Sequence, residues 1–529
     1  MESVFKPKHW PLWILAASLL LFESWRLFDF FLAFDGWGRV PLISFLIVLL
    51  FFKPLLEAGI RLGMVPFIAN PIMSPARNGH RVAVVTTFVP GKESLDVLEN
   101  TLKALVSLSY THDTWVLDEG NELRVRQLCE SLGAKHFSRL GHAEYQGEDG
   151  RYKSGTKYGN YNAWLDAVGV EEYEFLYAFD TDHIPCEGYI DWTIGCFTDD
   201  SVGYVQVADD YYNQAECLVA RGAREPHLVR NGITQRFYYR LGMPIITGSH
   251  NIHRIAALQQ VGGFAVHDAD DMLLTYEYRA SGWRGEFVPE VLAKGRVPTT
   301  WYDYLFQQMR WARSQVDIKR KRYPDLAAKL DWKSKLVAGL NGASFSNALA
   351  WVFVFLVIIY LSLSGVKVTE RPVQFLLQIV ELTAVLLVPA GLLRLYLLKG
   401  SDKPQYFSMG ILMSLVRWPF VLFAVVQGIF GISVKYTVTP KLDKARPGTW
   451  LILLVHGPIL FLLISSTVVG YKMHNQLDSF VPCLVAIYAT VILTIVAWSS
   501  RFECNQSLKF PISRMLFDSE HPSATVETS

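Results

Sequence analysis

Long apolar runs lie toward both ends of this chain and frame a central segment of mixed polarity, residues 66–335. A membrane-spanning helix needs about 20 mainly apolar residues. Five runs reach that length: roughly 41–60, 344–364, 373–397, 448–471 and 480–500. The run 10–33 is as long, although Glu23, Arg26 and Asp29 interrupt it, and no small-residue cleavage site marks it as a signal peptide. The pattern therefore predicts six spans, two before and four after the central segment.

The apolar run 405–431 is predicted to lie along the membrane surface instead of crossing it. Arg417 stands at its centre, and a charge at mid-membrane costs ~2.5–3.5 kcal/mol even on the lenient insertion scale. Basic residues flank the run on both sides, as expected in the cytoplasmic interface: Lys399, Lys403, Lys435, Lys441, Lys444 and Arg446. With six spans, both termini and the central segment face the cytoplasm. A crossing here would make seven and move the loop 432–447 and the C-terminus to the other side.

Within the central segment, short apolar runs alternate with helix-like stretches. Strand-like and helix-like runs follow one another at 81–89, 94–108, 114–121 and 171–182. Such alternation predicts a parallel, Rossmann-like α/β sheet, whose ligands lie beyond the carboxyl ends of its strands. Acidic residues fall at two of those ends, at 118–119 and 180–182.

Composition narrows the classes of function. A net charge of +1 without a basic stripe gives no reason to expect nucleic acid as a partner. The six cysteines form no CxxC or Cys/His cluster, so neither zinc nor a disulfide framework is predicted. We divide the chain into N-terminal spans (1–65), a globular domain (66–335), a C-terminal membrane region (336–504) and a cytoplasmic tail (505–529).

Asp180 and Asp182 follow the apolar strand FLYAF as an Asp-x-Asp pair. Two carboxylates on one side of a strand end can share a divalent cation, and Mg²⁺ and Mn²⁺ prefer such oxygen ligands. A solvated turn is the commoner meaning of the pair alone, but the buried strand before it favours a metal site.

A second acidic group precedes the helix-like run 272–283. Asp268, Asp270 and Asp271 lie within four residues of one another. Acids at a helix start are commonly caps or dipole partners, but three exceed what capping requires. Crowded like charges raise some of their pKa values, which makes the group a candidate general base.

Gln307, Arg310 and Trp311 stand three and four residues apart on a predicted helix and so share one face. Arg310 can hold diphosphate oxygens, and Trp311 offers a flat surface to a sugar ring. Simple packing of an amide and an indole is the alternative, but it poorly explains an arginine on the same face.

In this order and membrane setting, the three groups resemble the processive family-2 glycosyltransferases, which include cellulose, curdlan, chitin and hyaluronan synthases. The resemblance covers roughly residues 80–445. It implies a cytoplasmic α/β domain of GT-A fold inserted between transmembrane helices. It also implies a UDP-sugar donor, a growing polysaccharide as acceptor, and Mg²⁺ or Mn²⁺ as cofactor.

The resemblance further implies roles for individual residues. Donor binding falls to Thr87, Phe88, Asp118, Lys157, Asn162, Asp180, Gln307 and Arg310. Acceptor binding falls to Thr247, Gly248, Ser249 and Trp311. Asp180 and Asp182 hold the metal, and Asp271, with Asp270 beside it, is the catalytic base. Tyr436, Val438, Thr439 and Lys441 match a gating loop that follows an interfacial helix in cellulose synthases, which agrees with a surface position for 405–431.

We therefore predict an inverting, processive transferase of the plasma (inner) membrane that polymerises UDP-glucose into a β-glucan and passes it through its own spans. Asp270 replaces the glutamate of the Thr-Glu-Asp motif, and His250 stands in an acceptor segment that lacks the usual cysteine. These departures leave the sugar open, and a GlcNAc-containing polymer, chitin-like or hyaluronan-like, is the alternative.

Two other classes fit less well. A non-processive transferase acting on a lipid carrier has no need of Gln-x-x-Arg-Trp or a gating loop. A transporter or receptor needs more polar residues inside the spans than Glu381, Arg394 and Arg417 provide. Membrane lipid is an expected partner, and the sequence leaves open whether the chain forms oligomers or has accessory subunits.

Overall fold

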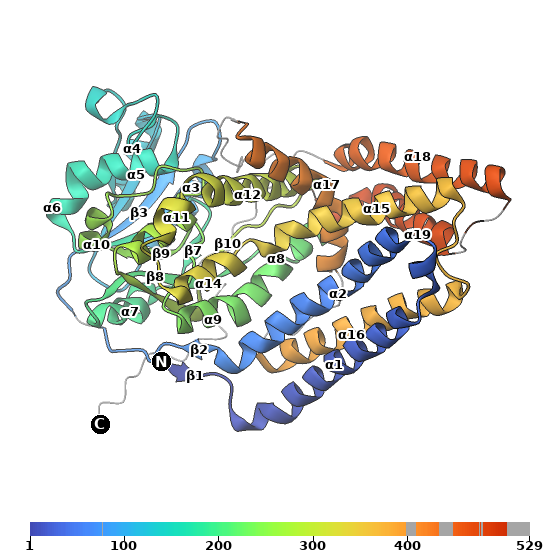
Figure 1. Cartoon of the computed structure of the whole chain (residues 1–529). Coiled ribbons are helices and arrows are strands. Elements are labelled where there is room, and N and C mark those ends of the chain that lie inside the picture. The colour runs from blue at the N-terminus through green and yellow to red at the C-terminus, as the bar shows by residue number, and fades with distance from the viewer. Residues whose placement is uncertain (77, 398–408, 433–447, 476, 478–479, 505–529) are drawn as a thin grey trace.

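The computed structural model of the chain describes residues 1–76, 78–397, 409–432, 448–475, 477 and 480–504. It shows an α/β part beside a bundle of long helices (Figure 1). Both the predicted gating-loop residues (Tyr436, Val438, Thr439 and Lys441) and the tail 505–529 lie outside the described residues.

One eight-stranded sheet, in the order β5–β4–β3–β6–β9–β8–β10–β7, forms the centre of the α/β part. Its strands are β3 (Val82–Phe88), β4 (Asp113–Asp118), β5 (Lys135–Phe137), β6 (Phe175–Phe179), β7 (Ile184–Pro185), β8 (Val202–Tyr211), β9 (Asn251–Arg254) and β10 (Arg284–Gly295). A separate antiparallel pair joins β1 (Glu2–Ser3) to β2 (Ala69–Asn70).

The sheet is mixed, so the prediction of a parallel sheet is only partly right. β5, β4, β3 and β6 pair in parallel, and so do β8 and β10. β9 is antiparallel to both β6 and β8, and β7 is antiparallel to β10. The reversal at β9 has a simple cause: Asn251 pairs with Ala178 near the carboxyl end of β6, so the chain enters β9 at that edge and must run back across the sheet.

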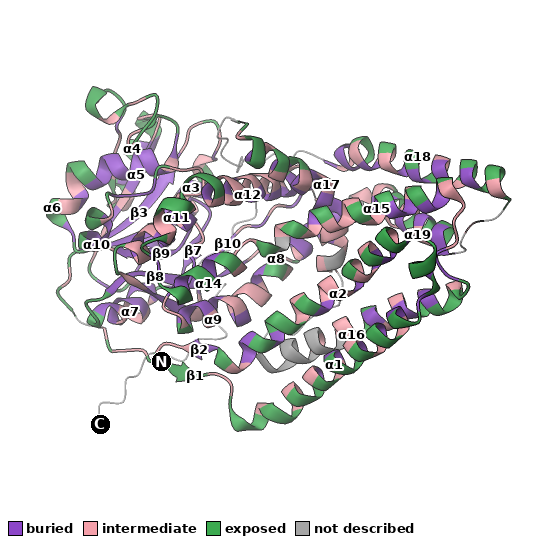
Figure 2. Ribbon diagram, in the orientation of Figure 1, coloured by how far each residue is buried: buried purple, intermediate pink, exposed green. Residues whose placement is uncertain are grey.

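Two apolar layers enclose the sheet. Ala83 and Val85 of β3 pack in one buried cluster with residues of α5, α10 and α11, whereas Val82 and Val84 pack on the other face with residues of α3 and α7. Strands buried on both faces need continuous apolar runs, which explains the sequence of β3. In Figure 2 the strands at the centre of this sheet are coloured mostly as buried.

The helices around the sheet are α3 (Leu95–Val106), α4 (Leu123–Leu132), α5 (Lys157–Trp164), α6 (Val170–Glu172), α7 (Tyr189–Thr193), α8 (Leu218–Val229), α9 (Gln235–Arg240), α10 (Ile255–Gln260), α11 (Asp270–Ala280), α12 (Trp301–Lys321), α13 (Tyr323–Ala327) and α14 (Trp332–Leu340). Those of the bundle are α1 (Trp10–Leu32), α2 (Pro41–Met64), α15 (Asn347–Ser364), α16 (Pro372–Leu397), α17 (Met409–Phe430), α18 (Thr449–His474) and α19 (Phe480–Ala497), followed by the short α20 (Ser499–Phe502).

Among the described residues, five helical stretches are long and apolar enough to cross a membrane: Pro41–Phe67, Asn347–Ser364, Leu412–Phe430, Thr449–His474 and Phe480–Ala497. Large apolar side chains on the outer faces of the bundle are exposed, for example Leu21 and Phe461, at 72% and 70%. Such a surface suits lipid better than water. Arg26 of α1 pairs with Glu381 of α16 at 2.6 Å, so these two charges inside predicted spans face each other. The count of six spans stays a prediction.

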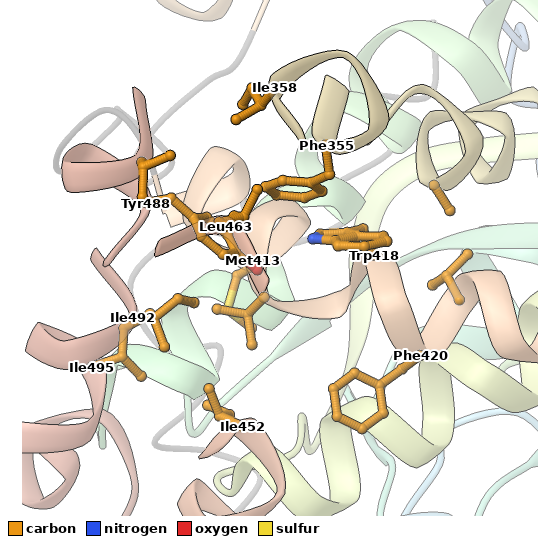
Figure 3. Packing of buried hydrophobic residues seen from close by; sticks show 14 of the residues in the cluster. Phe355, Ile358, Met413, Trp418, Phe420, Ile452, Leu463, Tyr488, Ile492 and Ile495 are labelled. Atoms are coloured by element: carbon orange, nitrogen blue, oxygen red, sulfur yellow. The ribbon is translucent and has the colours of Figure 1, made fainter. Parts of the chain in front are cut away.

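Helix α17 packs against α12 and α8 of the α/β part and against α15 of the bundle. Its contacts are close: a Cβ on Gly428 of α17 would come within 2.9 Å of Val316 on α12. On its other side Trp418 stacks on Phe355 of α15 with ring centroids 5.2 Å apart, in the cluster shown in Figure 3. One buried apolar cluster therefore continues from α12 through α17 into the bundle.

Candidate active site

The Asp-x-Asp pair lies just beyond β6 and is joined by a histidine that the sequence analysis did not single out. Ligand atoms of Asp180, Asp182 and His183 all lie within 4.8 Å of one another. Asp182 and His183 are 6% and 7% exposed, and their side chains are 3.2 Å apart. Two carboxylates and an imidazole form a donor set that suits a divalent cation such as Mn²⁺. The residue directly after Asp-x-Asp was the available signal for this ligand.

Lys157, in the first turn of α5, hydrogen-bonds both to the candidate metal group, that is Asp180, Asp182 and His183, and to the predicted acceptor segment, which includes residues 247–249. Its Nζ donates to Asp180 Oδ1 at 2.6 Å and to the Gly248 carbonyl at 2.7 Å. Burial works against the charge, but Asp180 raises the pKa of Lys157. The Asp180 backbone N–H donates to Ser249 Oγ at 3.0 Å. Three separate parts of the chain therefore meet here.

The candidate base lies on the other side of Gly248. Asp270 and Asp271 open α11, and Asp271 Oδ1 accepts the Met272 N–H at 2.7 Å. A Cβ on Gly248, whose φ is +88°, would come within 3.2 Å of Asp271 Oδ2, so glycine suits this position in both conformation and space. Burial raises the pKa of both aspartates, and their proximity adds to the effect at Asp270.

Helix α12 brings Arg310 to this group, and the next residue, Trp311, lies beside His227 of α8. The Arg310 charge acts on Asp271 and opposes the rise in its pKa that burial causes. The helix is fastened to the loop before α11, because His267 Nε2 lies 3.2 Å from Asp317 Oδ2, and Arg313 lies 3.6 Å from Asp268. Trp311 is half-buried. Gln307, on the same helix, is half-buried as well.

The residues predicted to bind the nucleotide are only partly brought together. Thr87 and Phe88 end β3 beside Asp118 at the end of β4, as expected. The Phe88 ring, however, is 3% exposed and packs in a core cluster with residues of α3 and α4. The Asp118 carboxylate is fully buried and accepts the backbone N–H groups of Gly120 and Glu122 at 2.9 and 2.6 Å.

Asn162 is also engaged by the protein itself. Its side-chain amide donates to the Phe264 carbonyl at 3.0 Å and accepts the Phe264 N–H at 2.7 Å. Thr247 is held differently, since its backbone N–H donates to Gln206 Oε1 at 2.9 Å. Asn162 therefore fastens α5 to the loop after α10, and nucleotide contact by Asn162, Asp118 and Phe88 stays a prediction.

His250, in the predicted acceptor segment, packs beside His183 of the candidate metal group. Its ring lies 5.0 Å from that of His183, centroid to centroid. Burial lowers its pKa to about 3, so the ring is neutral. Its φ of +40° is unusual for a residue with a Cβ, and it marks the sharp turn into β9.

Residues 178–398 match the profile of the family described as glycosyl transferase family group 2. The chain is 27% identical over 243 residues to glucomannan 4-beta-mannosyltransferase 1 of Cyamopsis tetragonoloba, covering 44% of this chain and 45% of that protein. It is 25% identical over 328 residues to the cellulose synthase 1 catalytic subunit [UDP-forming] of Komagataeibacter xylinus, covering 60% and 42%. The matches thus span less than half the length of either relative.

A solved structure also resembles the chain: the mannosyltransferase PcManGT from Pyrobaculum calidifontis in complex with GDP-Man and Mn²⁺. Its TM-score is 0.49 at 15% identity, over 74% of this chain and 99% of that one. The family match includes the Asp180–His183 group, the candidate base and α12, all at the carboxyl side of an α/β sheet. Residues 178–398 therefore match a family-2 glycosyltransferase domain, which is an enzyme domain of the hexosyltransferase class, and the chain is similar in sequence to cellulose and glucomannan synthases.

Proposed function

We propose that this chain is an integral membrane, processive hexosyltransferase that builds a β-linked polysaccharide from a nucleotide sugar, with UDP-glucose as the first donor to test. The meeting of Asp180, Lys157, Gly248 and Asp271 at one sheet edge carries this proposal. The candidate metal group, the Lys157 ammonium and the candidate base then all lie around the short segment that contains Gly248. The similar cellulose synthase catalytic subunit is described as UDP-forming, which supports UDP as the nucleotide that this chain releases.

In this reaction the acceptor hydroxyl at the chain end gives its proton to Asp271. The hydroxyl oxygen bonds to the anomeric carbon of the donor from the face opposite the diphosphate, whose bond to that carbon breaks, so the configuration inverts. Arg310 and Lys157 face the negative charge that the leaving diphosphate gains. A divalent cation held by Asp180, Asp182 and His183 would add the charge neutralisation that such sites supply. Trp311 stacks on the acceptor sugar.

The helix contacts support a membrane role for the same domain. Arg417, at the centre of apolar α17, donates from Nη1 to Gln308 Oε1 of α12 at 2.6 Å. The charge thus points to the catalytic domain, which supports an interfacial position for α17 even though Leu412–Phe430 is long and apolar enough to cross a membrane. A cytoplasmic position of the domain and of both termini is part of the same proposal. On this proposal the product leaves through the bundle that shares its apolar core with α12.

A mannose-containing product is the second candidate, because one relative is a glucomannan mannosyltransferase. Purified chain in lipid nanodiscs with Mn²⁺ or Mg²⁺ is given radiolabelled UDP-glucose, UDP-GlcNAc, UDP-GlcA or GDP-mannose. High-mass β-linked polymer from one donor is the expected result, and its linkage identifies the product. Label found only in a single glycolipid would favour a non-processive enzyme. No transfer from any donor would refute the proposal.

The base assignment has its own test. Asp271→Asn is expected to lower polymer synthesis at least about 100-fold, in line with the loss of a general base, while UDP binding measured by calorimetry is retained. Asp268→Asn is the matched control, since Asp268 is an aspartate of the same acidic group but contacts Arg313 instead. Equal activity of Asp271→Asn and Asp268→Asn would remove Asp271 from this role.

A further inference from the structure

A buried polar cluster lies beside Trp311, and no step proposed above uses it. It consists of Asp209 and Tyr211 at the end of β8, His227 of α8, and Arg230 and Asn231 just after α8. Asp209 is 6% exposed and His227 is 9% exposed. The cluster sits at the same sheet edge as the metal group, because β8 runs alongside β9 and β10 to that edge.

Asp209 is the centre of the cluster. Its Oδ2 accepts from Tyr211 Oη at 2.8 Å, from His227 Nδ1 at 2.5 Å and from Arg230 Nη2. Its Oδ1 accepts from Asn231 Nδ2 at 2.8 Å. Burial alone would raise the pKa of Asp209, but the neighbouring Arg230 and His227 hold it well below its usual range. The carboxylate is therefore ionised and fixed by four donors.

The orientation of His227 follows from this bond. Burial lowers the pKa of His227, although Asp209 opposes the effect. Two polar neighbours hold Nδ1, since Asp209 Oδ2 lies 2.5 Å and Arg230 Nη2 2.7 Å from it. The nearest polar group to Nε2 within the described residues is the Tyr211 hydroxyl, 3.5 Å away, and its proton already goes to Asp209. Within the described residues, Nε2 is thus the ring nitrogen with no hydrogen bond closer than 3.5 Å.

The imidazole lies next to the proposed acceptor surface. The His227 and Trp311 ring centroids are 6.3 Å apart with the planes at 64°, so one ring presents its edge to the other. Arg230 connects the cluster to the candidate base: burial works against its charge, but Asp209 and, more weakly, Asp271 raise its pKa. The cluster therefore lies beside the stacking surface, and its Arg230 is within electrostatic reach of the base.

We propose that His227, oriented by Asp209 and Arg230, binds the acceptor sugar: Nε2 forms a hydrogen bond with a hydroxyl of the ring that stacks on Trp311. This contact fixes the rotation of the ring on the indole, so that the hydroxyl to be glycosylated points toward Asp271. His227 transfers no proton, and Asp209 is a positioning residue. The inference rests on the proposed function and specifies which residues recognise its acceptor.

The test uses the partition of donor sugar in one reaction. Full-length protein in nanodiscs is given UDP-[¹⁴C]glucose and Mn²⁺, and label in polymer is compared with free glucose released by hydrolysis. In His227→Ala the ratio of polymer to free glucose should fall about ten- to a hundredfold, the effect of one lost hydrogen bond in a buried site. The KM for UDP-glucose should be unchanged, because the donor does not touch His227.

Two further variants, His227→Gln and His227→Asn, distinguish the loss of the hydrogen bond from a loss of folding. His227→Gln places a polar group near the Nε2 position and should restore much of the ratio, whereas His227→Asn keeps only the Nδ1 position and should not. His112→Ala is the control: His112 is also hydrogen-bonded, to Thr114 Oγ1 at 3.0 Å, but it precedes β4 at the opposite edge of the sheet. It should leave the ratio unchanged.

The outcomes separate the two proposals. If the wild type makes polymer and both His227→Ala and His227→Gln keep its ratio, the inference about His227 is overturned and the proposed function stands. If KM for UDP-glucose rises in step with the loss of polymer, His227 acts on the donor and the inference again fails. If the wild type makes no polymer, and releases neither UDP from UDP-glucose nor GDP from GDP-mannose, the proposed function fails and this inference fails with it.

Discussion

Replacing Arg417 by methionine tests whether α17 is attached to the catalytic domain by a specific polar bond. Arg417 Nη1 donates to Gln308 Oε1 at 2.6 Å, and Gln308 is only 5% exposed. Methionine keeps the length of the arginine stem and hence most of its packing against α12. The substitution therefore removes chiefly the charged donor and leaves the Gln308 carbonyl oxygen buried.

The expected effect can be worked from these contacts. A hydrogen bond to a charged group contributes about 1.5–3 kcal/mol, and a buried polar atom left without a partner costs about 1–3 kcal/mol. We expect Arg417→Met to lower the free energy of unfolding by about 2 kcal/mol. Gln308→Leu should cost a similar amount, because it leaves the guanidinium in an apolar interface. The double variant should also cost about 2 kcal/mol, since both partners are then removed together.

The assay is a double-mutant cycle on the detergent-solubilised protein. The free energy of unfolding is taken from SDS titration followed by tryptophan fluorescence for the wild type, both single variants and the double variant. A coupling free energy near 2 kcal/mol is expected for residues in direct contact. Additive single effects, or an unchanged stability in Arg417→Met, would refute the reasoning and return Arg417 to a lipid-facing or solvent-facing position.

Three further predictions concern the site and its supports. If Asp271 is the base, it acts only when ionised, and burial raises the pKa of both Asp270 and Asp271. A plot of kcat/KM against pH should therefore fall on its acidic side at a pH above about 4, where an ordinary aspartate titrates. A fall only at or below about pH 4 would contradict this. Gly295→Ala should raise the Mn²⁺ concentration needed for half-maximal Mn²⁺ binding, measured by electron paramagnetic resonance. The added Cβ would lie 2.2 Å from His183 Nε2 and would force the imidazole to move. Unchanged binding would show that His183 is no ligand. Glu503→Ala should lower the melting temperature by a few degrees, because Glu503 Oε1 accepts the N–H groups at the starts of α12 and α18 at 2.8 and 2.7 Å. The loss corresponds to about 1–3 kcal/mol in the free energy of unfolding. An unchanged melting temperature would mean that neither helix start depends on Glu503.

Much of the architecture could be read from local patterns. The apolar run before Asp180 and Asp182 predicted a buried strand that ends in acids, and β6 followed by the metal group confirms it. The three- and four-residue spacing of Gln307, Arg310 and Trp311 predicted a helix, which is α12. These features depend on side-chain periodicity and strand-end position, which neighbouring residues determine.

Other predictions were incomplete because they concerned contacts between distant segments. The antiparallel β9 depends on where the chain enters the sheet, which no periodicity records. The buried positions of Phe88 and Asn162 depend on packing against α3, α4 and the loop after α10. Residue identity and family resemblance suggested ligand contacts for both side chains, but only their neighbours in space show how their atoms are used.

The sequence by itself therefore determined the elements, the membrane-type helices and the chemical groups that such a transferase needs. Only the tertiary structure decided which groups meet: His183 with the Asp-x-Asp pair, Arg417 with Gln308, and Asp209 with His227 beside Trp311. The physical reason is that strand and helix propensities act over a few residues along the chain. Hydrogen bonds and ion pairs depend instead on distances in space, between residues that lie 18 to 109 positions apart in the last two pairs.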